Sequence, residues 1–108
     1  MREQRRFPRL NLNVRIEYTI IDKSIGAQKA QIKDISTAGL NIRTNELLEK
    51  GVYLYIKFYL PKEKTQIEAI SKVAWSKESG PKIFETGIEF VKIGYADQVR
   101  IGKLITEA

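Results

Sequence analysis

Alternation between apolar and polar positions is the clearest pattern in this chain. Val14, Ile16, Tyr18 and Ile20 are separated by polar residues, and apolar residues occupy every second position of 52–60. Successive side chains of a strand point to opposite faces, so both segments predict strands with one buried face. In the first segment the other face is polar and is expected to contact water.

Weaker patterns predict four more strands, at residues 28–35, 40–44, 67–75 and 84–91. The links are short and rich in turn residues, and 67–75 alternates poorly. We expect one helical turn over 45–50 and an amphipathic helix over 95–106, whose apolar face carries Val99, Ile101, Leu104 and Ile105. The fold class is therefore all-β: a six-stranded antiparallel barrel, or a small sandwich, followed by a C-terminal α-helix.

The composition limits the chemistry that the chain can perform. A chain of 108 residues predicts one domain that can bury a core without covalent crosslinks. Cysteine and histidine are both absent, which excludes disulfides, zinc sites with Cys or His ligands, and catalysis based on either residue. No metal cluster, phosphate loop or acid–base pair is evident, so we expect a protein that is not an enzyme. No apolar run could span a bilayer and no secretory signal is recognisable, so we expect a cytoplasmic protein.

Arginine is concentrated near the N-terminus, on a chain of net charge +6. Pro8 disfavours helix at the preceding residue, so we expect residues 1–12 to form an extended arm that is mobile without ligand. On an extended chain Arg5 and Arg9 lie on one side, roughly 13 Å apart, while Arg6 points the other way. Each guanidinium can bind a phosphate, or the N7 and O6 acceptors of guanine, in a bidentate manner. The alternative is a solvated arm whose arginines pair with nearby acidic residues.

A second polar group follows the second expected strand, at Asp34, Ser36 and Gly39. An ionised carboxylate only accepts hydrogen bonds, and guanine presents N1–H and an exocyclic amine on one edge. Ser36 can donate to a phosphate or base acceptor, and Gly39 would allow a positive φ in the turn and let a ligand approach the backbone closely. These residues are also common in ordinary turns. Together the two groups predict a site for a nucleotide, and a guanine nucleotide fits best.

The two motifs, in this order and about 25 residues apart, resemble those of a PilZ domain. That family is marked by an Arg-x-x-x-Arg arm, here Arg5 and Arg9, and by an (Asp/Asn)-x-Ser-x-x-Gly turn, here Asp34, Ser36 and Gly39. The segments 73–75 and 87–90 are also similar to the late strands of PilZ barrels. The resemblance covers nearly the whole chain.

The resemblance implies a receptor for cyclic di-GMP, a second messenger of bacteria, in a six-stranded barrel whose N-terminal arm folds over the nucleotide. Arg5 and Arg9 would hold guanine edges and phosphates, and Asp34, Ser36 and Gly39 would line the guanine pocket. Further candidates are Arg6, for a phosphate contact or a stacking plane, and Arg43 and Trp75. For Trp75 the alternative is packing at a strand end.

The resemblance also suggests how the domain is organised and how it would signal. We expect one PilZ-like domain over 1–108, with an arm at 1–12, a barrel at 13–92 and a helix at 95–106. Nucleotide binding would change a surface that a separate partner protein recognises, in control of motility, biofilm or exopolysaccharide, and the chain is either a complete adaptor or part of a larger protein.

Two alternatives remain open. One is a PilZ-like adaptor that binds a protein and no nucleotide. The other, which we consider less favourable, is a small basic barrel that binds single-stranded nucleic acid on Tyr53, Tyr55 and Tyr59 beside Lys57. We favour the interpretation that these tyrosines cover the barrel exterior or pack under the final helix.

Overall fold

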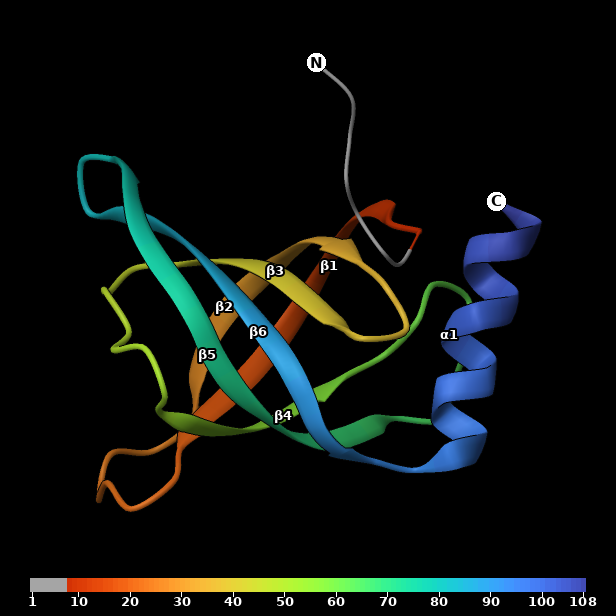
Figure 1. The fold of residues 1–108 in the computed structure, drawn as a ribbon, viewed down its shortest axis with the longest axis horizontal. Helices are drawn as coiled ribbons and strands as arrows, with labels where there is room; N and C mark the ends of the chain where they lie inside the picture. The colour runs from red at the N-terminus through yellow and green to blue at the C-terminus, as the bar shows by residue number, and fades with distance from the viewer. Residues whose placement is uncertain (1–7) are drawn as a thin grey trace.

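The structure is a computed structural model that describes residues 8–108, so Arg5 and Arg6 lie outside the described residues. The strands are β1 (Leu10–Ile20), β2 (Gln28–Ile35), β3 (Gly39–Thr44), β4 (Tyr53–Phe58), β5 (Ile67–Gly80) and β6 (Ile83–Ile93), and they precede the helix α1 (Tyr95–Glu107). All strand pairs are antiparallel, and the order β1-β2-β3-β6-β5-β4 closes into a barrel (Figure 1). The predicted barrel with a C-terminal helix is confirmed, and the sandwich is excluded.

The alternation in the sequence decides which side chains fill the barrel. Leu54, Ile56 and Phe58 of β4 are buried, as are Ile16 and Tyr18 of β1. Together with apolar residues of the other four strands they form one core cluster. Burial of apolar surface stabilises a fold by about 25 cal/mol per Å², so this shared interior is the main source of stability.

Two strands, β1 and β5, extend furthest beyond their predicted bounds. β1 begins at Leu10, and Leu10 and Leu12 continue the alternation of Val14, a signal that the sequence already carried. Residues 10–12, expected in the arm, therefore belong to β1, and Leu10 and Asn11 pair with β2. β5 continues to Gly80, and the loop expected at 79–81 is reduced to a tight turn in which Lys82 has a φ of 57°.

Irregular pairing explains why the pattern of β5 is hard to read. The register between β5 and β6 shifts between Ile70 and Ser71 and again between Val73 and Trp75. Each β-bulge places an extra residue in one strand and interrupts the period of two. The sequence of β5 therefore forms a strand although its apolar and polar residues do not alternate regularly.

The helical turn predicted at 45–50 is wrong. This segment is irregular, and it brings Leu48 into the core with 4% of its surface exposed. The backbone N–H of Leu48 donates to the hydroxyl of Ser76 over 3.3 Å. The segment ends at Gly51, whose φ of 92° favours glycine.

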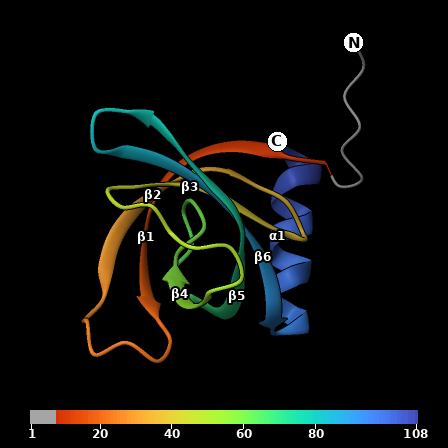
Figure 2. The same cartoon turned by 60° about the vertical axis from the view of Figure 1, so that its left-hand side comes forward.

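Helix α1 stands beside the barrel next to the turn between β2 and β3, as two views show (Figures 1 and 2). Ile101 is fully buried, and Leu104 and Ile105 pack against the core. Val99 was predicted on the same face but is 42% exposed, so that prediction is wrong. Among residues 8–108, no helix is long and apolar enough to cross a membrane.

Candidate functional site

Strand register brings polar residues from distant parts of the chain into one row across the barrel. Asp34 of β2 lies opposite Asn11 of β1 and Asn41 of β3. Asn41 lies opposite Gly87 of β6, which lies opposite Trp75 of β5. Leu40 and Ile42, which flank Asn41, and Ile88, which follows Gly87, belong to the core, and Trp75 is exposed, so this row lies on the outer face.

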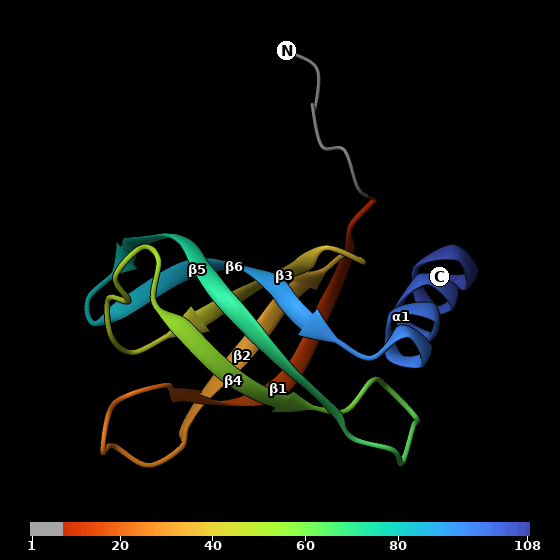
Figure 3. The ribbon, with the colours of Figure 1, turned by 60° about the horizontal axis from the view of Figure 1, so that its bottom comes forward.

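The carboxylate of Asp34 accepts hydrogen bonds from two side chains. Arg9 Nη1 lies 2.6 Å from Oδ1, and Asn41 Nδ2 lies 3.4 Å from Oδ2. The side chain of Asp34 is 12% exposed and that of Arg9 is 32% exposed, so the ion pair is partly shielded from water. The sequence predicted ligand contacts for both residues, and the structure brings this arginine of the arm and the carboxylate of the turn together as a direct ion pair. Arg9 directly precedes β1, so this ion pair lies at the N-terminal end of β1, which Figure 3 shows.

Ser36 shapes the turn that follows Asp34. Its hydroxyl accepts hydrogen bonds from the backbone N–H groups of Ala38 (3.1 Å) and Gly39 (3.2 Å), and its own N–H donates to the carbonyl of Gly39 over 2.9 Å. Such serine turns fix the backbone locally. Because Ser36 is only 1% exposed, its observed role is to build the site, and direct contact with a ligand stays a prediction.

Gly39 is needed for a different reason from the one expected. Its φ is not positive, so the backbone freedom that the sequence analysis considered for it is not used here. Instead it begins β3 opposite Glu89, and a Cβ at this position would lie 2.1 Å from the carbonyl oxygen of Ile88. Glycine therefore allows β3 and β6 to approach each other closely beside the site.

Trp75 forms the far end of the row. A Cβ on Gly87 would lie 2.3 Å from the indole Nε1, so the absent side chain at Gly87 makes room for the ring. Trp75 remains 42% exposed, and Lys77 Nζ lies 5.7 Å from the ring centroid. The indole thus packs on Gly87 and leaves part of its surface exposed, while contact with a ligand stays a prediction.

Arg43 lies opposite Gln31 of β2, three residues before Asp34. It is exposed on β3 and, with Arg15 and Lys29, lines a polar hollow of about 360 Å³. It also helps to lower the pKa of the Glu85 carboxyl, although the largest cause is the hydrogen bond from Lys33, 2.9 Å long. The structure therefore places Arg43 in a neighbouring basic region and records no contact between it and Asp34.

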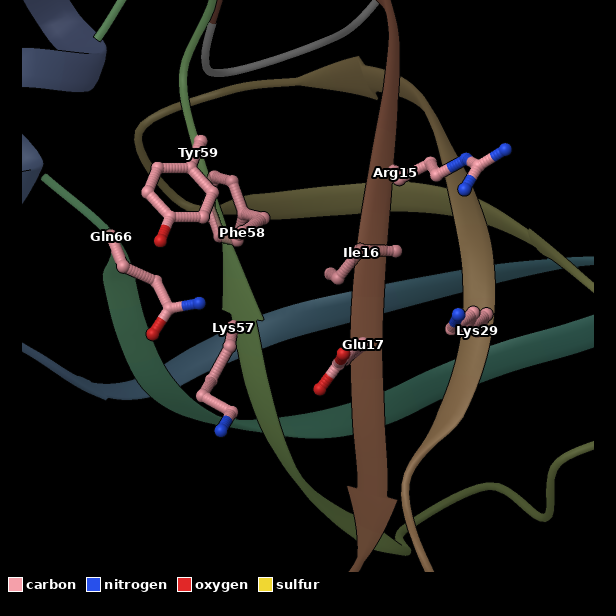
Figure 4. A pocket seen from close by; sticks show the side chains of 8 residues that line it. All are labelled: Arg15, Ile16, Glu17, Lys29, Lys57, Phe58, Tyr59 and Gln66. Carbon is pink, nitrogen blue, oxygen red and sulfur yellow. The ribbon is translucent and has the colours of Figure 1, made fainter. Parts of the chain in front are cut away.

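A second hollow, of about 220 Å³, lies between β1 and β4. Figure 4 shows Arg15 and Lys29 on one side of β1, with Glu17, Lys57 and Tyr59 on the other. Among the motif residues that the structure describes, none lines this hollow. It is an apolar depression with a charged rim, separate from the row.

The tyrosines considered for stacking lie along the outside of β4. Tyr53 and Tyr59 are 45% and 46% exposed, whereas Tyr55 donates to Glu68 and has Lys57 Nζ 5.9 Å from its ring. This placement agrees with the interpretation that they cover the barrel exterior. Residues 8–108 contain no group of three or more His, Cys, Asp or Glu side chains that could hold a metal ion.

Two residues of the row, Asn41 and Gly87, were not identified as site residues from the sequence. Asn41 could have been found from its position two residues after Gly39, since alternation places it on the same face of a strand. Gly87 carried no comparable signal, because only the pairing of β6 with β3 and β5 brings it between Asn41 and Trp75.

Comparison with known families agrees with this geometry. The PilZ domain family model matches residues 3–107. The chain belongs to the PilZ domain family. PilZ domains are ligand-binding domains of signalling proteins, and both motifs of this chain lie within the matched range. No curated protein matches the sequence significantly.

Solved structures share the fold at low sequence identity. The inhibitor of motility MotI (DgrA) of Bacillus subtilis has a TM-score of 0.82 at 17% identity, covering 97% of this chain and 51% of its own. The PilZ domain of Escherichia coli YcgR with c-di-GMP has 0.76 at 11%, covering 97% and 91%. The K. pneumoniae MrkH–c-di-GMP complex has 0.77 at 21%, covering 97% and 51%. The chain thus spans about half the length of MotI and MrkH.

Proposed function

We propose that this PilZ domain binds cyclic di-GMP on the outer face of its barrel and relays the binding event to a protein partner. The observation that carries the proposal is the Arg9–Asp34 pair, which joins the two family motifs beside the Ser36 turn. The solved YcgR and MrkH structures, which share the fold, contain c-di-GMP. The fold, the motifs and their contact support the same ligand.

The Arg9–Asp34 pair suggests how the ligand enters. A guanidinium and the N1–C2–N2 edge of guanine both present planar N–H donors to a carboxylate. Arg9 therefore occupies Asp34 in the way a guanine base would. When the nucleotide binds, a base takes up hydrogen bonds to Asp34, and Arg9 turns its donors towards O6, N7 or a phosphate of the ligand.

The remaining candidate residues have distinct roles in this proposal. Ser36 and Gly39 hold the turn against β6, and Trp75 offers a flat surface for stacking. From the sequence, Arg5 and Arg6 supply further cations for the two phosphates, and Arg43 draws the anionic ligand towards the barrel over a longer distance. Catalysis is not part of the proposal.

Energetics favour ordering of the arm by the ligand. Fixing a residue costs about 1–2 kcal/mol of backbone entropy, whereas hydrogen bonds that involve a charged group each contribute roughly 1.5–3 kcal/mol. Residues 10–12 already belong to β1 and Arg9 is already paired, so these residues add little to that cost. Each charge-assisted contact to a phosphate offsets the ordering of roughly one or two residues.

The helix α1 is suited to carry the signal outwards. Gln98 Nε2 donates to the carbonyl of Thr37 over 3.1 Å, and a Cβ on Gly102 would meet the Thr37 methyl at 3.6 Å. Thr37 lies between Ser36 and Gly39 of the motif. A ligand that changes this turn will therefore change the position or the stability of α1, which a partner can recognise.

Isothermal titration calorimetry with cyclic di-GMP, and with cyclic di-AMP as a control, tests the proposal. We expect saturable binding of the guanine compound alone, and loss of binding in Arg9→Ala with an unchanged circular dichroism spectrum. Arg15→Ala, which removes an exposed arginine outside the row, should bind like the wild type. Absence of heat with cyclic di-GMP would contradict the proposal and favour an adaptor that binds protein only. Binding of arbitrary single strands that weakens steeply with salt would instead indicate a nucleic-acid protein.

A further inference from the structure

Asn41 presents an unpaired hydrogen-bond acceptor in the middle of the row. Its Nδ2 donates to Asp34, but its Oδ1 is buried and accepts no hydrogen bond from residues 8–108. A buried polar atom without a partner destabilises a protein, so most such atoms are paired or serve a function. The Nδ2 contact of 3.4 Å is longer than the usual 2.7–3.2 Å, so positioning Asp34 does not account for the amide.

The order of donors and acceptors along the row matches one edge of guanine. Arg9 offers a donor, Asp34 an acceptor and Asn41 Oδ1 a second acceptor. The Watson–Crick edge of guanine presents O6, an acceptor, then N1–H and the 2-amino group, both donors. The corresponding edge of adenine has a donor, an acceptor and a C–H group. In the same position, the donor of adenine would face the donors of Arg9, and its acceptor would face the acceptor oxygens of Asp34.

We infer that Asn41 Oδ1 accepts a hydrogen bond from the 2-amino group of one guanine of the ligand and thereby helps the site to select guanine. The inference rests on the proposed function. Gly87 opposite Asn41 has no side chain, and the indole of Trp75 occupies the room that this leaves. Binding in this manner therefore requires the indole, which is 42% exposed, to move aside and then to pack against the base.

The experiment compares two ligands that differ only in this amino group. Calorimetry would measure the affinity of the wild type and of Asn41→Leu for cyclic di-GMP and for cyclic di-IMP, which lacks both 2-amino groups. One neutral hydrogen bond corresponds to roughly a tenfold change in affinity, so the wild type should prefer cyclic di-GMP by about that factor or more. Asn41→Leu should lose about tenfold of this preference. Contacts of the second guanine contribute equally in both proteins and cancel in the comparison.

Two further variants control for folding and charge. Asn45→Leu makes the same exchange at an exposed position just after β3 and should keep the wild-type preference. Asn41→Asp retains acceptor oxygens at the site and should also keep it, even if total affinity falls beside Asp34. If Asn41→Leu does not fold or does not bind, the preference of Asn41→Asp for cyclic di-GMP over cyclic di-IMP tests the inference instead.

The outcomes separate the inference from the proposed function. If Asn41→Leu keeps the full preference, or Asn41→Asp loses it, Asn41 does not contact the amino group and the inference is overturned. A wild type that binds both ligands equally overturns it too, while leaving cyclic di-GMP as the ligand. If the wild type does not bind cyclic di-GMP, the proposed function itself fails.

Discussion

Exchange of Gly39 for alanine tests whether close packing of β3 on β6 is what requires glycine in the motif. The added Cβ would lie 2.1 Å from the carbonyl oxygen of Ile88 and 3.0 Å from the Cα of Glu89. Both atoms belong to the backbone, so no side chain can rotate away to relieve the overlap. The two strands must separate locally, by on the order of 1 Å, to restore an ordinary contact distance of about 3.5 Å.

The magnitude follows from this geometry. Overpacking of a tightly packed site costs typically 1–3 kcal/mol, and a clash with backbone belongs in the upper part of that range, about 2–3 kcal/mol. For a domain of this size each kcal/mol corresponds to about 4–8 °C in Tm. We therefore expect Gly39→Ala to lower Tm by about 8–24 °C and to weaken nucleotide binding, because the turn next to Asp34 moves with β3.

Thermal unfolding followed by far-UV circular dichroism, without ligand, measures the effect. Gly26→Ala is the matched control, since a Cβ there meets nothing within 4 Å and its φ is not positive. That variant should unfold at the wild-type temperature or slightly above it, as the unfolded chain loses entropy. A Tm of Gly39→Ala within about 2 °C of that control would refute the packing explanation.

Three further predictions concern the surroundings of the site. Gly87→Ala should cost less stability than Gly39→Ala, because its clash is with the movable ring of Trp75; a red shift in tryptophan fluorescence would show the ring displaced, and an unchanged spectrum with a large loss of Tm would contradict this. Gln98→Ala should increase hydrogen exchange in α1 and reduce the protection that ligand gives to the helix; equal protection in variant and wild type would argue against α1 as the output. Burial and a hydrogen bond to the carboxylate of Glu46 raise the pKa of the Tyr18 hydroxyl well above 10.0. The contribution of this group to stability is therefore complete below pH 10 and is lost as pH rises further. When Tm is measured at increasing pH, it should fall less steeply in Tyr18→Phe than in the wild type.

Local information was enough to predict much of this protein. The period of two at 52–60 and 14–20 identified the strands and the side chains that fill the barrel, because the alternation of a strand is a property of its own backbone. The residues of β2 were predicted without error. Asp34 and Arg9 were identified by type and spacing, since few residues can bind a phosphate or a guanine edge in this manner.

The arrangement of the site depended on the tertiary structure. The row from Asp34 to Trp75 exists because strands far apart in sequence pair in a particular register, and bulges shift that register in ways that a period of two does not reveal. Gly39 was predicted for its backbone freedom, yet its neighbour Ile88, 49 residues away, is what excludes a side chain. The sequence by itself thus determined which strands form and which residue types can bind a nucleotide. Only barrel closure decided that Asn41 stands next to Asp34, because contacts between strands are set by the pairing of whole strands rather than by any local pattern.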